Sequence, residues 1–262
     1  MHETTPSIFL IARPAIDLEA MRAYLEDVGG DSWLDRRLDE TGGNPDQGEL
    51  LVEFCGRACY RSWEPGLNPN VSRVRADPRV YLENILSSAH GSVLEHANYT
   101  FALRNVSRVA THEIVRHRAG AAYSQESLRY VRLVDIGFRV PPVLEPLRQQ
   151  CIELVEKLEE FQVSAAKALR IDEQGIPFHV KKEATSALRR LAPIGVSTDL
   201  IMTMNLRTLR HVVEMRTDPG AEEELRLIFG RVGEIMVQEA SGVFQDFQRA
   251  EDGSWTPKYR KV

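Results

Sequence analysis

The sequence predicts one α/β domain over residues 1–262. Short apolar segments at residues 8–12, 99–103 and 138–140 have the length and composition of strands. Longer segments around them repeat apolar residues every three or four positions, which is the spacing of helices that pack one face on a core. No internal repeat or linker separates these elements, so we expect them to share one core.

The N-terminal third is expected to be mainly helical after a buried first strand at residues 8–12. Apolar spacing predicts helices over residues 18–25 and 50–58, and Asp77-Pro78 has the form of an N-cap followed by proline at the first helical position. Residues 27–48 are polar and acidic and contain two Gly-Gly pairs. We predict an insertion loop or lid there, because glycine pairs favour irregular structure.

The middle of the chain combines helices with a sharp bend. Apolar spacing predicts a helix over residues 106–118, a Gly-Ala bend at 119–122 and a segment 123–129 that turns back across it. An edge strand is expected at 138–140. The amphipathic helix that follows over 147–161 should serve to pack the core.

The C-terminal third is expected to contain two further helices. Pro177 opens the first, whose apolar residues should face inward and which ends at Arg189-Arg190. A second basic cluster follows at residues 205–211. The last helix should begin near Gly220 and bury its apolar residues, which are Leu225, Phe229, Val232, Met236 and Ala240.

Charge and hydropathy exclude several classes of protein. The formal net charge of −5 argues against a protein that coats nucleic acid, because such proteins usually carry a positive excess. The N-terminus has no basic start followed by an apolar run, and nowhere do eighteen apolar residues follow one another. We therefore expect a cytoplasmic protein that neither spans a membrane nor binds nucleic acid.

The cysteines and histidines do not predict a metal site. Cys55, Cys59 and Cys151 suit reduced thiols better than a disulfide framework. Cys55 and Cys59 lie four residues apart on a predicted helix, but no second cysteine pair or nearby histidine completes a ligand set. His112 and His117 are five residues apart, which turns them to different faces of a helix and argues against a zinc-protease site.

Residues 116–130 concentrate the polar chemistry of the chain. This stretch contains Arg116, His117, Arg118 and Arg129 together with several hydroxyl side chains. Arginine forks match phosphate bidentately, and clustered arginines repel one another unless an anion or acidic partners lie among them. We predict an anion and nucleotide site; the alternative is a surface helix end whose basic residues stabilise the helix dipole. No Rossmann, P-loop or Gly-x-Ser-x-Gly motif occurs.

This stretch is the second of three ordered clusters. The first is residues 90–96, and the third combines Arg189 with the basic cluster at 205–211. The series resembles the flavin-dependent thymidylate synthase (ThyX) family, whose signature is Arg-His-Arg followed after seven residues by Ser. Here eight residues separate Arg118 from Ser127. The extra residue lies where the family holds the uracil nucleotide.

Other segments extend the resemblance over most of the chain, from about residue 51 to residue 226. Residues 90–101 are similar to the family's His-x-Ser-x-x-Glu-His segment with the Thr-Phe that follows it, and residues 123–130 to the second half of the signature. Residues 188–193 and 205–216 are similar to the family's phosphate and flavin segments, and residues 221–226 to its terminal helix.

The resemblance implies helices around a central, mostly antiparallel sheet, and a homotetramer whose active sites are shared between subunits. It implies reductive methylation of dUMP to dTMP, with FAD as redox carrier, methylene-tetrahydrofolate as carbon donor and NADPH as reductant. By position, FAD would be bound by His90, Ser92, Arg116, His117, Arg118 and Asn205. The nucleotide would be bound by Glu113, Gln125, Ser127, Arg129, Tyr130, Arg189 and Arg210.

These assignments are chemically consistent. Arg129 and Arg189 can bind the phosphate with charge-assisted hydrogen bonds. Arg210 is the expected catalytic residue, because an arginine near a uracil carbonyl stabilises negative charge that develops on the ring. The flavin performs the hydride chemistry, so no cysteine nucleophile is needed, and the three cysteines are expected on apolar helix faces. Ser127 is expected to donate a hydrogen bond to the substrate.

Two alternatives stay open from the sequence. A relative could methylate UMP in a specialised nucleoside pathway, which the extra residue before Ser127 favours. A non-catalytic nucleotide- or RNA-binding protein could use the same arginine clusters and would bind oligonucleotides with a steep salt dependence. The negative net charge and the 90–96 segment weigh against this second alternative.

Overall fold

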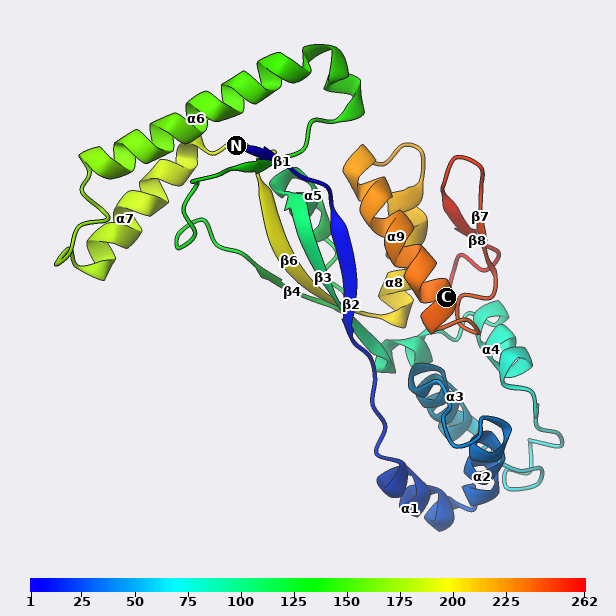
Figure 1. Cartoon of the computed structure of the whole chain (residues 1–262). Coiled ribbons are helices and arrows are strands. Elements are labelled where there is room, and N and C mark those ends of the chain that lie inside the picture. Colours follow the sequence, from blue (N-terminus) through cyan, green and yellow to red (C-terminus); the bar gives the residue numbers. More distant parts are fainter.

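A four-stranded antiparallel sheet lies at the centre of the chain. The structure is a computed structural model that describes all residues 1–262. The strands run in the order β2 (Ser7–Ala12), β3 (Asn98–Ser107), β6 (Ser197–Asn205) and β4 (Ala121–Gln125), and each neighbouring pair is antiparallel. Helices lie against one side of this sheet and toward both of its ends (Figure 1). The predicted fold class, helices around a mostly antiparallel sheet, is confirmed.

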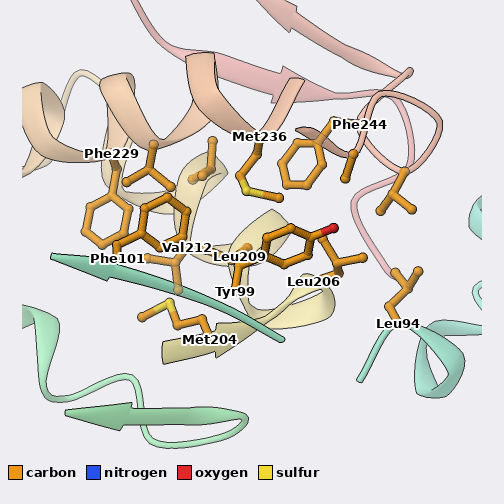
Figure 2. Close-up of a cluster of buried hydrophobic side chains, with 14 of the residues drawn as sticks. Leu94, Tyr99, Phe101, Met204, Leu206, Leu209, Val212, Phe229, Met236 and Phe244 are labelled. Atoms are coloured by element: carbon orange, nitrogen blue, oxygen red, sulfur yellow. The ribbon is translucent and has the colours of Figure 1, made fainter. Parts of the chain in front are cut away.

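One face of the sheet carries the main core. The helices that cover it are α5 (Arg108–Ile114), α8 (Leu206–Thr217) and α9 (Glu223–Glu239). Tyr99 and Phe101 of β3 point into this core together with Met204 of β6 (Figure 2). Alternate residues of β3 and of β6 are buried, as in a sheet with one covered face. The predicted C-terminal helix is confirmed, and its five predicted core residues are all buried.

The opposite face of the sheet stays uncovered by the rest of the chain. Phe9 and Ile11 of β2 expose 53% and 54% of their surface. The strand predicted at residues 8–12 is present, but the prediction that it is buried is wrong. It lies at the edge of the sheet, where only Ile8 and Leu10 pack against the core.

Three N-terminal helices form a second, smaller core. They are α1 (Leu18–Val28), α2 (Asp31–Glu40) and α3 (Gln47–Tyr60). The loop predicted at residues 27–48 is wrong, because α2 occupies its centre with Trp33 and Leu34 fully buried. The ring of Trp33 lies 5.1 Å from that of Trp63, a partner far along the chain. Buried Glu53 of α3 binds Arg37 of α2 at 2.8 Å and so joins the two helices.

Helix α4 (Pro78–Ser87) begins as predicted. The Asp77 carboxylate accepts hydrogen bonds from the backbone N–H groups of Arg79 and Val80 at 2.7 and 3.2 Å. A short 3-10 helix, η1 (Gly91–His96), then leads into β3. The strand expected after His96 is therefore confirmed.

The long helices α6 (Arg148–Ala168) and α7 (Phe178–Leu188) form a hairpin at the end of the molecule opposite α1–α3 (Figure 1). Both helices were predicted, but the predicted packing is wrong for α7 and holds only in part for α6, where Val155 is buried. Helix α7 has no buried residue, and Leu154 and Phe178 expose 62% and 66% of their surface. Their spacing therefore indicates apolar faces that this chain does not cover by itself.

The remaining elements are short. The edge strand predicted at 138–140 corresponds to β5 (Gly137–Phe138), which pairs in parallel with β1 (His2–Glu3). None of the helices combines the length and the hydropathy that crossing a membrane requires. The short elements are β1 (His2–Glu3), β5 (Gly137–Phe138), η2 (Pro142–Leu147), η3 (Arg189–Leu191), β7 (Phe247–Arg249) and β8 (Trp255–Pro257).

Candidate active site

The Arg-His-Arg triplet lies in a turn and not in the predicted helix over 106–118. Strand β3 extends to Ser107, whose side chain then caps α5 by accepting from the Ala110 N–H at 3.1 Å, and α5 ends at Ile114. Residues 115–120, which we call the arginine turn, connect α5 to β4. Arg116 and Arg118 are exposed there and form no ion pair, so both guanidinium groups are free to bind an anion.

The arginine turn is fixed to the N-terminus of α8. The Asn205 N–H donates to the Gly120 carbonyl at 3.0 Å, and the Thr208 hydroxyl donates to the Ala119 carbonyl at 2.8 Å. Asn205 also caps α8, because its side-chain oxygen accepts from the Thr208 N–H at 2.8 Å. The sequence placed Asn205 and the triplet in one site, and the structure joins Asn205 to Gly120, two residues after the triplet.

Gly120 is required by this contact. Its φ of +64° is a left-handed conformation, and a Cβ would lie 2.2 Å from Asn205 Nδ2. We expect Gly120→Ala to lower the free energy of unfolding by about 1–3 kcal/mol through backbone strain, and further through this clash. Gly42→Ala is the matched control, since Gly42 has a φ of +59° with no atom within 4 Å. Equal losses in denaturant unfolding of the two variants would contradict the role of the contact.

Arg216 lies at the centre of the polar cluster. Its guanidinium donates from Nη1 to Glu113 Oε2 at 2.7 Å and from Nε to His117 Nε2 at 2.9 Å. It therefore joins the end of α8 to the end of α5 and to the arginine turn. Arginine has five N–H donors, so some of its donors remain for a ligand. A cavity of about 640 Å³, also lined by His211, Trp255 and Arg260, opens beside it.

The sequence assigned this position to Arg210, and the structure contradicts that assignment. Arg210 is buried and binds Asp246 at 2.7 and 3.0 Å, while its Nη2 also donates to the Tyr259 carbonyl at 3.1 Å. Arg210 shares an apolar helix face with Leu206 and Val213, four and three residues away. Arg216 follows Val212 and Val213 by four and three residues and so lies on the same side of α8, which means that helical spacing alone does not separate the two arginines.

His117 is neutral in this arrangement. Burial, followed by the charge of Arg216, lowers the pKa of His117 from 6.5 to about 4. The hydrogen bond is consistent with this state, because Nε2 must be unprotonated to accept from Arg216. The Tyr123 hydroxyl fixes the backbone of the same turn by donating to the His117 carbonyl at 2.7 Å. Tyr123 and Arg216 are the two members of the site that the sequence did not assign.

The low pKa of His117 makes a prediction about stability. As the pH falls from 6.5 to 4, the unfolded chain protonates His117 before the folded protein does. The stability that neutral His117 contributes is therefore present above pH 6.5 and is lost toward pH 4. We expect the Tm of the native protein to fall more steeply over this range than that of His117→Asn, which keeps an acceptor without titrating. Parallel curves would contradict a buried neutral His117.

The other predicted nucleotide residues gather at the start of α5 and along α7. Gln125 donates to the Thr111 hydroxyl at 2.9 Å, and Arg129 Nε donates to Ser186 at 3.3 Å. The Tyr130 ring stacks on that of Phe178 with centroids 6.1 Å apart. These contacts place Arg129 and Tyr130 against α7.

Arg189 lies close to this second group. The pKa of Arg108 is lowered by burial, and the nearby charge of Arg189 lowers it further. Ser127 is half-buried, whereas Arg129 and Arg189 are exposed. Neither arginine forms an ion pair in the chain. Two like charges without acidic partners are typical of a site that an anion completes.

His90 and Ser92 flank the start of η1, near the N-terminus of α8. The His90 ring contacts the Tyr60 ring at 5.8 Å, and Ser92 is exposed. The Leu206 N–H donates to the Ala97 carbonyl at 3.0 Å, which fixes η1 to α8. The predicted FAD residues therefore surround the N-terminus of α8, although no single pocket contains all of them.

The three cysteines differ in their exposure to solvent. Burial raises the pKa of Cys55 to about 11, which disfavours the nucleophilic thiolate. Cys59 is exposed, so the prediction that all three cysteines lie on apolar faces is wrong for this residue. No group of three or more His, Cys, Asp or Glu side chains has the arrangement of a metal site.

The fold and these contacts define an α/β protein whose unpaired arginines, arginine turn and Arg216 cluster are a candidate anion-binding site. Residues 41–240 match the family model described as thymidylate synthase complementing protein. The flavin-dependent thymidylate synthase of Mycobacterium marinum is 36% identical over 208 residues, which are 78% of this chain and 81% of that protein. That of Mycobacterium tuberculosis is 35% identical with the same coverage. The chain belongs to the flavin-dependent thymidylate synthase family.

Solved structures share the fold. Helicobacter pylori thymidylate synthase X, crystallised with FAD and dUMP, aligns with a TM-score of 0.53 and 20% identity over 76% of this chain and 93% of that one. The UMP/dUMP methylase PolB of Streptomyces cacaoi, bound with 5-Br UMP, aligns with a TM-score of 0.59 and 18% identity over 94% of this chain and 96% of that one.

Proposed function

We propose that this protein methylates the uracil ring of dUMP at C5 to give dTMP, with FAD, methylene-tetrahydrofolate and NADPH. Family membership supports this proposal, as do the FAD and dUMP bound by the Helicobacter pylori protein. The observation that carries it is the Arg216 cluster: one guanidinium joins Glu113, His117 and the arginine turn at the mouth of a cavity. Such a donor can stabilise charge that develops on a uracil carbonyl.

The residues present fit a flavin dinucleotide. The exposed Arg116 and Arg118 have no acidic partner, and the Gly120 backbone approaches α8 more closely than any side chain would allow. His117, Asn205, His90 and Ser92 provide further polar groups along the same edge. When bound, FAD supplies the transfer of hydride, and the protein positions and polarises the reactants.

The chain's own residues hold the nucleotide. Arg129 and Arg189 would bind the phosphate, with Ser127, Gln125 and Tyr130 beside them. Arg216, held by Glu113, would donate to the uracil carbonyl in place of the Arg210 expected from the sequence. Neutral His117 then serves as a hydrogen-bond acceptor that orients Arg216 and adds no competing charge.

We infer that the complete site forms between subunits of a homotetramer. The nucleotide group contacts α5 at Thr111 and the Arg216 cluster contacts it at Glu113, while Arg129 and Arg189 stay exposed in the chain by itself. Exposed apolar residues of β2, α6 and α7 provide surface for self-association. Light scattering of the purified protein tests this inference, and a monomeric mass with full activity would contradict it. The expected cytoplasmic location and the absence of nucleic-acid binding stay predictions.

A second candidate is methylation of UMP. The extra residue between Arg118 and Ser127 and the fold shared with the UMP/dUMP methylase PolB both favour it. Turnover of dUMP and UMP, each with methylene-tetrahydrofolate and NADPH, separates the two substrates. UMP turnover equal to or faster than dUMP turnover would favour the second candidate.

The visible spectrum of the protein tests both candidates at once. We expect purified or FAD-loaded protein to show flavin absorbance that NADPH bleaches, with methylated nucleotide formed when the folate is present. A protein that binds no FAD, oxidises no NADPH and retains oligonucleotides in a salt-dependent way would instead be the non-catalytic nucleotide- or RNA-binding protein.

Arg189 provides a residue-level test of nucleotide binding. We expect Arg189→Ala to raise the nucleotide Kd roughly 10–150-fold, because a charge-assisted hydrogen bond contributes about 1.5–3 kcal/mol. Arg190→Ala is the matched control, since Arg190 is adjacent and equally exposed. Calorimetric titration measures both constants, and unchanged binding in folded Arg189→Ala would remove Arg189 from the site.

A further inference from the structure

The loop between α3 and α4, residues 61–77, carries three arginines that have no partner in the chain. Arg61, Arg73 and Arg75, which we call the loop arginines, are all exposed. Their guanidinium groups form no hydrogen bond and no ion pair, although most other arginines of the chain are paired. Positive charge is therefore concentrated on this loop of a chain whose formal net charge is −5.

The two acidic residues of the loop do not neutralise this charge. Glu64 accepts hydrogen bonds from the Ser32 hydroxyl at 2.6 Å and from Arg36 at 3.1 Å, so it is bound to α2. The Asp77 carboxylate caps the N-terminus of α4. Unpaired arginines that lie together repel one another, and an anionic ligand relieves that repulsion.

Buried Arg57 fixes the backbone of the loop. It donates from Nη1 to the Ser62 carbonyl at 2.8 Å and from Nη2 to the Arg75 carbonyl at 2.6 Å, and Glu53 holds its Nε at 2.8 Å. One guanidinium therefore brings the backbone next to Arg61 close to the backbone of Arg75. A fixed backbone lowers the cost of ordering that binding must overcome.

The loop begins beside the proposed cofactor site. Arg61 directly follows Tyr60, whose ring contacts the His90 ring at a centroid distance of 5.8 Å. The Asn68 side chain donates to the Tyr60 carbonyl at 2.8 Å, which folds the loop back onto the end of α3. Figure 1 shows the loop extending from α3 to the outer edge of the molecule. A ligand that starts near His90 can therefore continue along the loop.

We propose that the loop arginines bind the polyanionic tail of a folate, in which each further γ-linked glutamate adds one α-carboxylate. The proposal rests on the proposed function, which gives the protein a folate substrate that must reach the flavin beside His90. Carboxylates spaced along a flexible chain can each meet a separate exposed guanidinium. The phosphates of NADPH suit the loop less well, because Asp77 already occupies the N-terminus of α4 that would otherwise hold a phosphate.

Calorimetric titration of the FAD-loaded protein with tetrahydrofolate tests the proposal without turnover. We expect the pentaglutamyl form to bind about tenfold more tightly than the monoglutamyl form, which corresponds to about 1.4 kcal/mol. Three exposed ion pairs can supply a difference of this size. The triple variant Arg61→Ala, Arg73→Ala, Arg75→Ala should bind both forms about equally. The corresponding triple lysine variant should keep most of the preference, because lysine keeps the charge. An unchanged preference in the alanine variant would overturn the proposal.

Two controls separate the loop from net charge and from NADPH. The triple variant Arg22→Ala, Arg170→Ala, Arg231→Ala removes the same formal charge from arginines that pair with acidic residues elsewhere. It should keep the tenfold preference, and losing it would overturn a local site. The alanine variant of the loop should keep the native KM for NADPH. A raised KM for NADPH with an unchanged folate preference would assign the loop to NADPH and overturn the proposal.

A γ-linked pentaglutamate peptide with a fluorescent label tests the loop independently of the flavin. Fluorescence polarisation should show binding to the native protein that the alanine variant and about 0.5 M salt both abolish, because exposed charges are screened at that ionic strength. Equal binding by the native protein and the alanine variant would overturn the proposal. A protein that binds no FAD and methylates no nucleotide would contradict the proposed function, and the peptide measurement would still decide whether the loop binds polyglutamate.

Discussion

Replacing Arg216 with alanine is expected to reduce kcat about 100- to 1,000-fold while the protein stays folded. The reason is that Arg216 is the one guanidinium held between Glu113 and His117 beside the large cavity. Removing a single preorganised donor to a developing negative charge costs about this factor in other enzymes. The kcat of Arg216→Lys should lie between those of the native enzyme and Arg216→Ala, because lysine keeps the charge and lacks the planar fork of arginine.

Steady-state rates with saturating nucleotide, folate and NADPH measure this effect. Arg231→Ala is a suitable control, since Arg231 forms an exposed pair with Glu234 at 2.8 Å away from the cluster. Activity of Arg216→Ala within about threefold of the native enzyme would correspond to less than about 1 kcal/mol and would exclude the proposed role.

Replacing Arg210 is expected to act on stability instead. Arg210 and Asp246 are both buried, and removing one partner of a buried pair leaves an uncompensated charge that costs about 3–5 kcal/mol. For a chain of this size, Arg210→Met should lower the Tm by about 6–20 °C. The double variant Arg210→Met with Asp246→Leu should recover much of this loss, because it removes both charges.

Differential scanning calorimetry of the two single variants and the double variant measures this prediction. The folded fraction of Arg210→Met should turn over at nearly the native rate. A variant with native Tm and strongly reduced kcat would restore the original assignment of Arg210 to the active site.

The parts of the fold that the sequence predicted are those encoded locally. Asp77-Pro78 marks the start of α4 because the cap and the N–H groups that it binds lie within three residues. Helix α2 was missed because Trp33 is buried against Phe54 and Trp63, contacts that no local spacing reveals. Short-range patterns therefore predicted most helices, while strands β4 and β6, helix α8 and the packing partners required the structure.

Contacts between residues far apart in the chain also limited the prediction of the site. The resemblance placed the Arg-His-Arg triplet and Asn205 near one cofactor, and the contact at Gly120 brings them together. It did not distinguish Arg210 from Arg216, because both arginines follow the apolar period of α8. Their partners separate them: Arg210 binds Asp246, whereas Arg216 binds Glu113 and His117. The contribution of Tyr123 depends on its hydroxyl reaching back to the His117 carbonyl, which no sequence pattern indicates.

The α6–α7 hairpin has a thermodynamic consequence. A helix pair gains most of its stability from the apolar surface that it removes from water, and α7 buries no residue within its own chain. If other subunits cover this surface, part of the free energy of unfolding belongs to association and depends on protein concentration. Dilution would then loosen the hairpin first, together with Ser186 and Arg189, which it carries next to the nucleotide group. Substrate affinity and subunit association would thus be linked through one pair of helices.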